Sequence, residues 1–230
     1  KKVPIIASLM GSDTHQSKFM KFIVKLFSDY RWRKTIVKSE DMKIRLGLRN
    51  ASVLPNGVDL NLFQPLNKKE CRQKLGWDLD KKYLLFASNP DREEKNFALT
   101  QAVINRIKII PVELKVVYNI EHFQMPFYLN ASDAILLTSK WEGSPNIVKE
   151  AMACNIPVVS TKVGDIEYLF GNTKGYYYTD PDPNKIAEKI NYFLNNDIKP
   201  NGRQRIIELK LDSESIADKL IQLYQEVLSK

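Results

Sequence analysis

Apolar and polar positions follow two alternating patterns along the chain. Short runs rich in β-branched and aromatic residues are separated by longer segments in which apolar residues recur every three or four positions. The expected strands are residues 3–9, 35–38, 51–54, 83–88, 114–118, 133–138, 156–160 and 175–178, and the expected helices are 17–29, 40–47, 96–109, 145–154, 184–195 and 214–228. This alternation predicts an α/β fold built on parallel sheets.

One stretch shows neither the helical nor the strand periodicity. Residues 54–65 (LPNGVDLNLFQP) hold an Asn-Gly pair and two prolines, which are signals of a loop. We therefore place residues 1–65 in one Rossmann-like domain with its linker and residues 66–230 in a second Rossmann-like domain. About three strands precede the linker, too few for a doubly wound domain, and the chain begins at Lys1. We expect the N-terminal domain to be incomplete.

The charge of the chain is concentrated near its start. The formal net charge is +8, and residues 1–50 hold 12 basic and 4 acidic side chains, whereas the rest of the chain is balanced. Since no nucleic-acid-binding motif accompanies these charges, we expect no nucleic-acid partner. The apolar runs are shorter than the roughly 20 residues that span a bilayer, and no signal peptide is visible. We expect a cytoplasmic location, and Cys71 and Cys154 have no metal-ligand or redox spacing.

The expected helix 17–29 is basic on one side and apolar on the rest. Lys18, Lys21 and Lys25 form one stripe, and further basic residues continue to residue 34. A helix of this kind can lie on an anionic membrane surface, so residues 17–34 are a candidate for association with the cytoplasmic face of a membrane. An ordinary packed helix with a solvated lysine stripe remains the alternative.

The segment with the clearest chemistry is residues 139–154 (SKWEGSPNIVKEAMAC). It follows an apolar strand, and Ser144 and Pro145 have the residue types of an N-cap and a first helical position. The turn before them opens at the carboxyl edge of the sheet, where free backbone N–H groups bind phosphates. Gly143 would allow a ligand to approach the backbone closely.

Two carboxylates flank this turn. Glu142 precedes Gly143, and Glu150 lies one helical turn after Asn146 on the same face. A carboxylate is poorly suited to a phosphate but accepts hydrogen bonds from hydroxyl groups. We expect Glu142 to bind the hexose of a sugar nucleotide and Glu150 its ribose; the alternative is that both are solvated surface residues.

Residues 142–150, followed by NIPVVST at 155–161 and VGD at 163–165, resemble the retaining glycosyltransferases of family four, the glycosyl transferases group 1. Residues 128–133 (YLNASD) and the linker at 55–65 resemble other parts of the same family. The resemblance covers residues 50–228 well and 1–49 more loosely. It implies a GT-B fold of two Rossmann-like domains, a nucleotide-diphosphate sugar donor bound mainly to the C-terminal domain, and neither a metal ion nor another cofactor.

The resemblance also implies individual roles. A basic pair after the first strand of the C-terminal domain grips the diphosphate in the family; here Lys95 fits that pattern, although Asn96 replaces the usual glycine, and the arginine is either displaced to Arg92 or replaced by Asn89. We therefore assign Glu142, Lys95 and Arg92 to the reacting centre. The expected donor-binding residues are Asn89, Tyr118, Asn119, Gly143, Ser144, Pro145, Asn146, Ile147 and Glu150, with Tyr118 and Asn119 near the base.

One family feature is missing. The family often has a histidine before the Gly-x-Asp that resembles residues 11–13, and here Met10 stands in that position. The expected function is metal-independent transfer of a hexose, with retention of configuration, to a glycan or lipid-linked acceptor in polysaccharide biosynthesis. A non-catalytic nucleotide-sugar or membrane-associated binding module, or a sugar-nucleotide epimerase of the same fold, remains the alternative.

Overall fold

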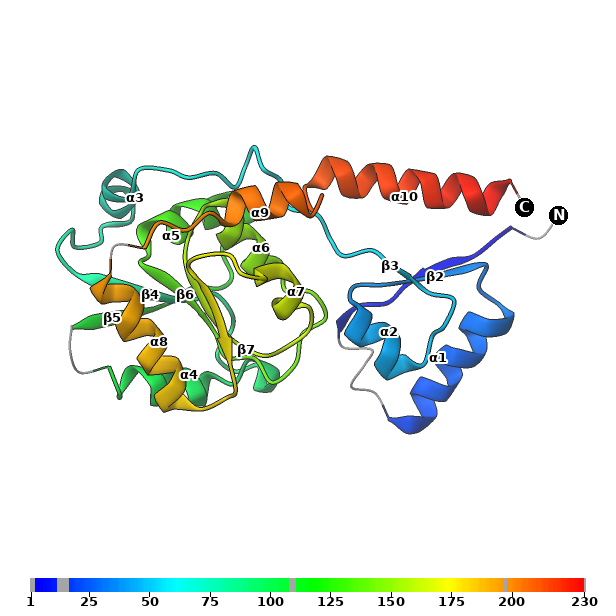
Figure 1. Cartoon of the computed structure of the whole chain (residues 1–230), viewed down its shortest axis with the longest axis horizontal. Helices are drawn as coiled ribbons and strands as arrows, with labels where there is room; N and C mark the ends of the chain where they lie inside the picture. The colour runs from blue at the N-terminus through cyan, green and yellow to red at the C-terminus, as the bar shows by residue number, and fades with distance from the viewer. Residues whose placement is uncertain (1–2, 12–16, 108–110, 197, 230) are drawn as a thin grey trace.

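The computed structural model describes residues 3–11, 17–107, 111–196 and 198–229 and shows two lobes, each built on a parallel sheet (Figure 1). The strands of the smaller lobe lie in the order β1-β2-β3 and those of the larger lobe in the order β5-β4-β6-β7-β8. Their bounds are β1 (Ile6–Ser8), β2 (Lys34–Val37), β3 (Ser52–Val53), β4 (Lys82–Phe86), β5 (Val112–Val116), β6 (Ala134–Leu137), β7 (Val158–Thr161) and β8 (Tyr176–Thr179). The predicted α/β fold with parallel sheets is confirmed.

Helices cover both faces of the larger sheet. The helices and short 3-10 turns before the last helix are α1 (Lys18–Tyr30), α2 (Glu40–Leu46), α3 (Lys68–Leu75), η2 (Glu93–Lys95), α4 (Phe97–Ile104), η3 (His122–Gln124), α5 (Met125–Ala131), α6 (Asn146–Ala153), α7 (Ile166–Phe170), α8 (Pro183–Asn195) and α9 (Gly202–Glu208). Leu84 of β4 packs with residues of α4 and α8, whereas Leu85 packs with residues of α6, α7 and α9. Successive side chains of a strand point to opposite faces, so β4 contributes to two separate cores.

The strand order fixes where a ligand site can form. From β4 the chain moves to β5 on one side, and it then returns to β6 on the other side of β4. The order therefore reverses between β4 and β6, which is the position where open α/β sheets form a crevice at the carboxyl ends of the strands. The segments that leave these two strands carry Lys95 and Glu142.

The last helix, α10 (Ser213–Leu228), leaves the larger lobe and lies along the smaller one (Figure 1). Its Leu223 and Val227 are buried with Ile36 and Leu54 in a small apolar cluster. The two lobes are thus joined twice, by the linker and by the segment before α10. A domain boundary at residue 65 stays a prediction, and α10 adds a C-terminal element to the smaller lobe.

Four helices were not expected from the sequence: α3, α5, α7 and α9. The segment that forms α3 (KKECRQKL) has no apolar stripe, but Cys71 and Arg72 are buried and Asn67 caps the helix with its side chain. Pro126 lies in the first turn of α5, where proline is tolerated. The helices α7 and α9 are five and seven residues long, too short to show a period. The helix expected over 96–109 ends at Ile104, and residues 108–110 lie outside the described residues.

Within the described ranges, the structure has no helix that is both long and apolar enough to cross a membrane.

A buried ion pair holds α3 and α5 to the edge of β4. Asp133, whose side chain is 9% exposed, accepts a hydrogen bond from Arg72 Nη2 at 2.8 Å and another from the backbone N–H of Tyr83 at 2.8 Å. Arg72 also donates to the carbonyl oxygens of Leu79 and Ala131. One carboxylate therefore fixes the start of β4 and of β6 relative to each other.

We predict that Asp133→Ala lowers the free energy of unfolding by about 3 kcal/mol, because it leaves the Arg72 guanidinium buried without its counter-ion. Urea unfolding followed by circular dichroism measures the change. Asp218→Ala, on an exposed position of α10, is the control and should unfold within about 0.5 kcal/mol of the parent. Equal unfolding midpoints for the two variants would contradict this role of Asp133.

Candidate active site

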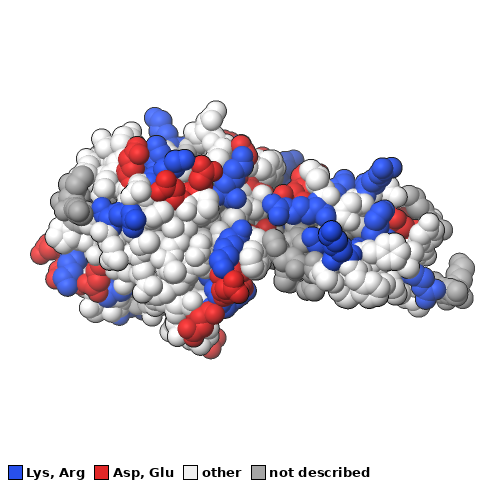
Figure 2. All heavy atoms as spheres, turned by 90° about the horizontal axis from the view of Figure 1, so that it is seen from below, with Lys and Arg blue, Asp and Glu red and all other residues white. Residues whose placement is uncertain are grey.

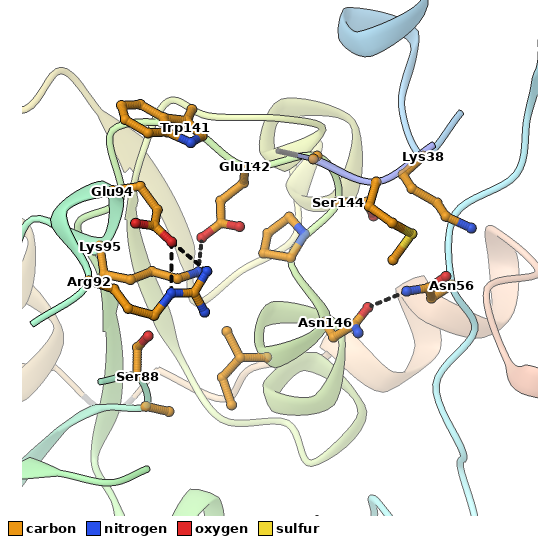
Figure 3. A pocket seen from close by; sticks show the side chains of 16 residues that line it. Lys38, Asn56, Ser88, Arg92, Glu94, Lys95, Trp141, Glu142, Ser144 and Asn146 are labelled. Carbon is orange, nitrogen blue, oxygen red and sulfur yellow. Dashed lines mark hydrogen bonds and ion pairs between the residues drawn. The ribbon is translucent and has the colours of Figure 1, made fainter. Parts of the chain in front are cut away.

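A cavity of about 450 Å³ lies between the two lobes, at the carboxyl ends of β4 and β6 (Figure 3). It is lined from the smaller lobe and the linker by Met10, Gly11, Lys38 and Asn56, from the segment after β4 by Ala87, Ser88, Arg92, Glu94 and Lys95, and from the segment after β6 by Trp141, Glu142, Gly143, Ser144, Pro145, Asn146 and Ile147. The position agrees with the reversal of strand order described above.

Eight of the residues singled out from the sequence line this cavity. They are Arg92, Lys95, Glu142, Gly143, Ser144, Pro145, Asn146 and Ile147. The other four, Asn89, Tyr118, Asn119 and Glu150, are not among its lining residues. Lys95 and Glu142 are 47 positions apart in the sequence, so only the fold brings them together.

Both basic side chains of the expected pair contact a carboxylate (Figure 3). Lys95 Nζ donates to Glu142 Oε1 at 2.6 Å, and both side chains are mostly buried. Glu142 Oε1 also accepts from Ser139 Oγ at 2.7 Å. Arg92 pairs with Glu94 and is exposed. Since an ammonium has three donors, Lys95 can hold Glu142 and an anionic ligand at the same time.

Three glycines let the backbone segments meet at one corner of the cavity. A Cβ atom on Gly143 would lie 2.9 Å from Gly11 Cα and 3.0 Å from Met42 Sδ, and a Cβ on Gly164 would lie 2.6 Å from the carbonyl oxygen of Gly143. Gly164 also has a φ of 55°, which other residues adopt only with strain. The structure shows that Gly143 makes room for the smaller lobe; it also lines the cavity, and room for a ligand beside it stays a prediction.

The start of α6 differs from the expectation by one residue. Pro145, rather than Ser144, is the N-cap, no side chain caps the helix, and Asn146 is the first helical residue. Ser144 therefore does not cap α6; its hydroxyl accepts a hydrogen bond from Lys149 Nζ at 3.1 Å. The first residues of α6, Asn146 and Ile147, line the cavity, and the dipole at a helix N-terminus favours an anion.

Glu150 lies deeper than a surface residue. Its side chain is 11% exposed, and Oε1 is 3.1 Å from His122 Nε2. Burial raises the pKa of the Glu150 carboxyl, while the hydrogen bond and charge of His122 act in the opposite direction. The His122 ring also packs against Phe63, with centroids 5.1 Å apart. The sequence did not single out His122, which comes from the segment after β5.

The remaining three residues lie on the segments after β4 and β5. Asn89 Oδ1 accepts the backbone N–H of Asp91 at 2.9 Å, which stabilises the turn before η2. Tyr118 is 41% exposed, and Asn119 has a φ of 54°. A role for Tyr118 and Asn119 at a nucleotide base, or for Asn89 at a phosphate, stays a prediction.

The cavity also has residues that the sequence analysis did not select. Lys38 follows β2, and its Nζ donates to the carbonyl oxygen of Leu54 at 3.4 Å. Asn56 of the linker donates to Asn146 Oδ1 at 3.4 Å. The available signal was positional: Lys38 comes directly after β2 and Asn56 three positions after β3, and ligands of open α/β folds bind outside the carboxyl ends of strands. Trp141 lay inside the selected motif and was passed over.

The ligand chemistry that fits this cavity is an anion joined to a polyol. Cationic side chains and helix N–H groups suit phosphates, and carboxylates with amide side chains suit hydroxyl groups. Among the described residues, no group of three or more His, Cys, Asp or Glu side chains is placed to hold a metal ion.

Residues 108–210 match the family described as Glycosyl transferases group 1. Bacillus subtilis TuaC, whose name assigns it provisionally to teichuronic acid biosynthesis as a glycosyltransferase, is 26% identical over 98% of this chain and 65% of its own length. CapM of Staphylococcus aureus, a capsular polysaccharide biosynthesis glycosyltransferase, is 33% identical over 48% of this chain and 31% of its own. This chain thus spans less than two thirds of either relative.

Solved structures share the architecture over nearly the whole chain. The Anabaena protein HepE in complex with UDP-glucose superposes with a TM-score of 0.83 at 16% identity, over 97% of this chain and 72% of HepE. Such a similarity establishes the fold, which is that of GT-B glycosyltransferases. Residues 108–210 of this chain are thus similar to the glycosyl transferases group 1 family, and the relatives that it matches are named as glycosyltransferases.

Proposed function

We propose that this protein is a retaining, metal-independent glycosyltransferase of family four that transfers a hexose from a nucleotide-diphosphate sugar to a glycan or lipid-linked hydroxyl. The observation that carries the proposal is the contact between Lys95 and Glu142 at the start of α6. It joins a cation for a diphosphate and a carboxylate for a sugar in one cavity. The glycosyltransferase homologues support it further.

The donor is proposed to lie across the switch between β4 and β6. Its diphosphate contacts Lys95, Arg92 and the backbone at residues 143–146, while Glu142 accepts hydrogen bonds from the hexose. Glu150 is proposed to bind the ribose, with Tyr118 and Asn119 near the base. HepE has been crystallised with UDP-glucose, so UDP sugars are the first donors to test.

The proposed reaction breaks the bond between the anomeric carbon and the diphosphate oxygen, and the acceptor hydroxyl attacks from the same face. A donor phosphate oxygen takes the hydroxyl proton, so the protein need not supply a base. The leaving diphosphate gains negative charge, and Lys95 and Arg92 stabilise that charge without a metal ion. Retention of configuration rests on the family resemblance, and activity should persist in EDTA.

The names of two relatives support the proposed class of acceptor. The names of TuaC and CapM refer to polysaccharide biosynthesis, and we propose the same class of acceptor here. We further propose that residues 1–65 belong to the acceptor-side domain and residues 66–230 to the donor-binding domain, whose last helix, α10, packs against the acceptor-side domain. The proposed location is cytoplasmic, at the cytoplasmic face of the membrane.

One observation favours a second function, a non-catalytic binding module. Met10 lines the cavity and is 48% exposed, where the family often has a histidine near the reacting carbon. A thioether cannot supply the hydrogen bonds of an imidazole. A protein that binds a sugar nucleotide without transferring the sugar would tolerate this replacement.

A thermal-shift screen of ADP, GDP, UDP and CDP sugars should give one base that raises the melting temperature, because a ligand that binds the folded state stabilises it by mass action. Product analysis with that labelled donor and a mixed glycan acceptor then decides the function. Sugar on the acceptor with retained configuration agrees with the proposal. Unchanged donor indicates a binding module, epimerised donor indicates an epimerase, and no shift with any donor contradicts nucleotide-sugar binding.

Lys95→Ala should raise the dissociation constant for that sugar nucleotide by roughly ten- to one hundred-fold, since a charged hydrogen bond to the diphosphate is lost. Isothermal titration calorimetry measures it. Lys140→Ala is the matched control: Lys140 also lies near the start of the motif, but it pairs with Glu93 and does not line the cavity. If both variants bind as tightly as the parent, Lys95 does not contact the diphosphate.

The surface of α1 supports the proposed membrane association. None of the residues of α1 is buried, and Phe19 and Phe22 are 69% and 60% exposed. Lys25 pairs with Asp29 at 2.7 Å, which offsets part of the local positive charge. Figure 2 shows Lys and Arg side chains beside uncharged surface on the smaller lobe. Exposed apolar rings next to basic side chains match the surface of an anionic bilayer.

The variant with Lys18→Gln, Lys21→Gln and Lys25→Gln should bind anionic vesicles about two orders of magnitude more weakly than the parent at low salt. Co-sedimentation with phosphatidylserine vesicles measures this, and raising the salt should weaken the parent as well. A control with Lys174→Gln, Lys185→Gln and Lys189→Gln removes the same charge from the larger lobe. Equal loss in both triple variants would mean that net charge, rather than α1, holds the protein on the vesicle.

A further inference from the structure

A fully buried lysine lies beneath the turn that the proposed function assigns to the diphosphate. Lys149 is in the middle of α6 and has no exposed surface. Its Nζ donates to the backbone carbonyl oxygen of Asn56 at 2.7 Å and to Ser144 Oγ at 3.1 Å. Both acceptors are neutral, whereas the other buried cation among the described residues, Arg72, is paired with Asp133.

The two acceptors belong to different parts of the cavity wall. Asn56 comes from the linker between the lobes, and Ser144 comes from the turn between β6 and α6. Asn56 also donates from its side chain to Asn146 Oδ1, as Figure 3 shows. The ammonium of Lys149 therefore links the anion-binding turn to the linker by hydrogen bonds. It lies behind the residues that line the cavity and is not one of them.

No carboxylate among the described residues forms a direct ion pair with Lys149. Asp165 at the start of α7, Glu150 on α6 and Lys38 after β2 act on it through their charges. Burial lowers the pKa of Lys149 to about 8, with the two carboxylates opposing that change. Burial also raises the pKa of Asp165 to about 6, and Asp165 Oδ1 has no hydrogen-bond partner among the described residues.

A buried charge of this kind lowers the free energy of unfolding, because the charged group loses its hydration. Replacing buried ionic groups by apolar side chains of similar volume is often neutral or stabilising. A methionine would fit the length of Lys149 and fill the same space. The charge therefore needs a reason other than stability, and the cavity above it, with its helix N-terminus and Lys95, offers one.

We propose that Lys149 is a positioning residue for the donor diphosphate: its buried ammonium fixes the 143–146 turn against the linker and adds positive potential beneath the phosphate site. The inference rests on the proposed function, because the anion it serves is the donor's. Lys149 does not touch the ligand. It acts through Ser144 and the backbone of the turn, so its contribution should depend on whether its own amine is protonated.

The direction of the pH effect separates this role from a structural one. The folded-state pKa of about 8 is below the ordinary value of 10.5. Above pH 8 the unfolded chain binds a proton that the folded chain has released, so this group's contribution to stability rises with pH up to about 10.5. The proposed contribution to anion binding instead falls above pH 8. Stability and affinity should therefore move in opposite directions.

The experiment measures by calorimetry, between pH 6.5 and pH 9.5, the dissociation constant for UDP-glucose. If another sugar nucleotide gives a larger melting-temperature shift in the donor screen, that sugar nucleotide is used instead. At pH 7, Lys149→Met should bind roughly ten-fold more weakly than the parent, because it lacks the charge beneath the turn. The parent should lose affinity above pH 8 and approach the variant. Lys149→Met itself should show a flat profile, and the control Lys185→Met, on the exposed side of α8, should follow the parent.

Each alternative result is decisive. If the parent binds no sugar nucleotide, the proposed function fails and this inference fails with it, because the anion that Lys149 serves is the donor's. If the parent binds and Lys149→Met has the same affinity and pH profile, this inference is overturned and the proposed function stands. If Lys149→Met does not fold, Lys38→Met decides, since Lys38 is the other cation near the turn whose pKa burial lowers. A flat parent profile, or one that Lys38→Met abolishes, overturns the inference.

Discussion

The contact of three glycines is the constraint on which the rest of the site depends. Gly11 of the smaller lobe, Gly143 before α6 and Gly164 before α7 approach so closely that a Cβ on any of them would lie under 3.0 Å from a neighbouring backbone atom. Because these segments leave the carboxyl ends of β1, β6 and β7, their contact closes one end of the cleft. The cavity beside them then receives side chains from both lobes, which no single Rossmann-like unit could supply.

The contact of the three glycines also affects how strongly the charges in the cleft interact. The closed cleft leaves Lys95 and Glu142 mostly buried at 2.6 Å from each other, and Lys149 is sealed beneath the same turn. Interactions between charges strengthen as water is excluded, so the cations around the turn affect an anion more than their number suggests. The same exclusion makes an unpaired buried charge costly. Lys149 and Asp165 are tolerated because Ser144 and the Asn56 carbonyl group partly replace the lost solvent.

The sequence led to half of the residues that line the cavity, because these residues fall within two short segments, 89–96 and 139–150. A strand followed by a short turn with Glu-Gly and then by a helix determines locally which residues lie at the end of the sheet. Lys38, Asn56 and His122 were missed for the opposite reason. Each is near the cavity or Glu150 only through strand order and the crossing of the linker, and no local motif marks it beyond a position after a strand. Lys149 was not selected from the sequence, because a lysine in a helix is expected to be exposed to solvent.

The sequence by itself determined the alternation of strands and helices, the class of fold and the turn between β6 and α6, since each depends on local periodicity and on the residues that begin or end an element. All eight expected strands are present, although their ends shift by one to three residues. Only the tertiary structure decided which loops meet. It assigned α10 to the smaller lobe, formed α3 around a buried Arg72, and turned Gly143 into a contact between lobes. These features depend on pairs of residues far apart in the chain, and their burial is a property of the assembled fold rather than of any segment.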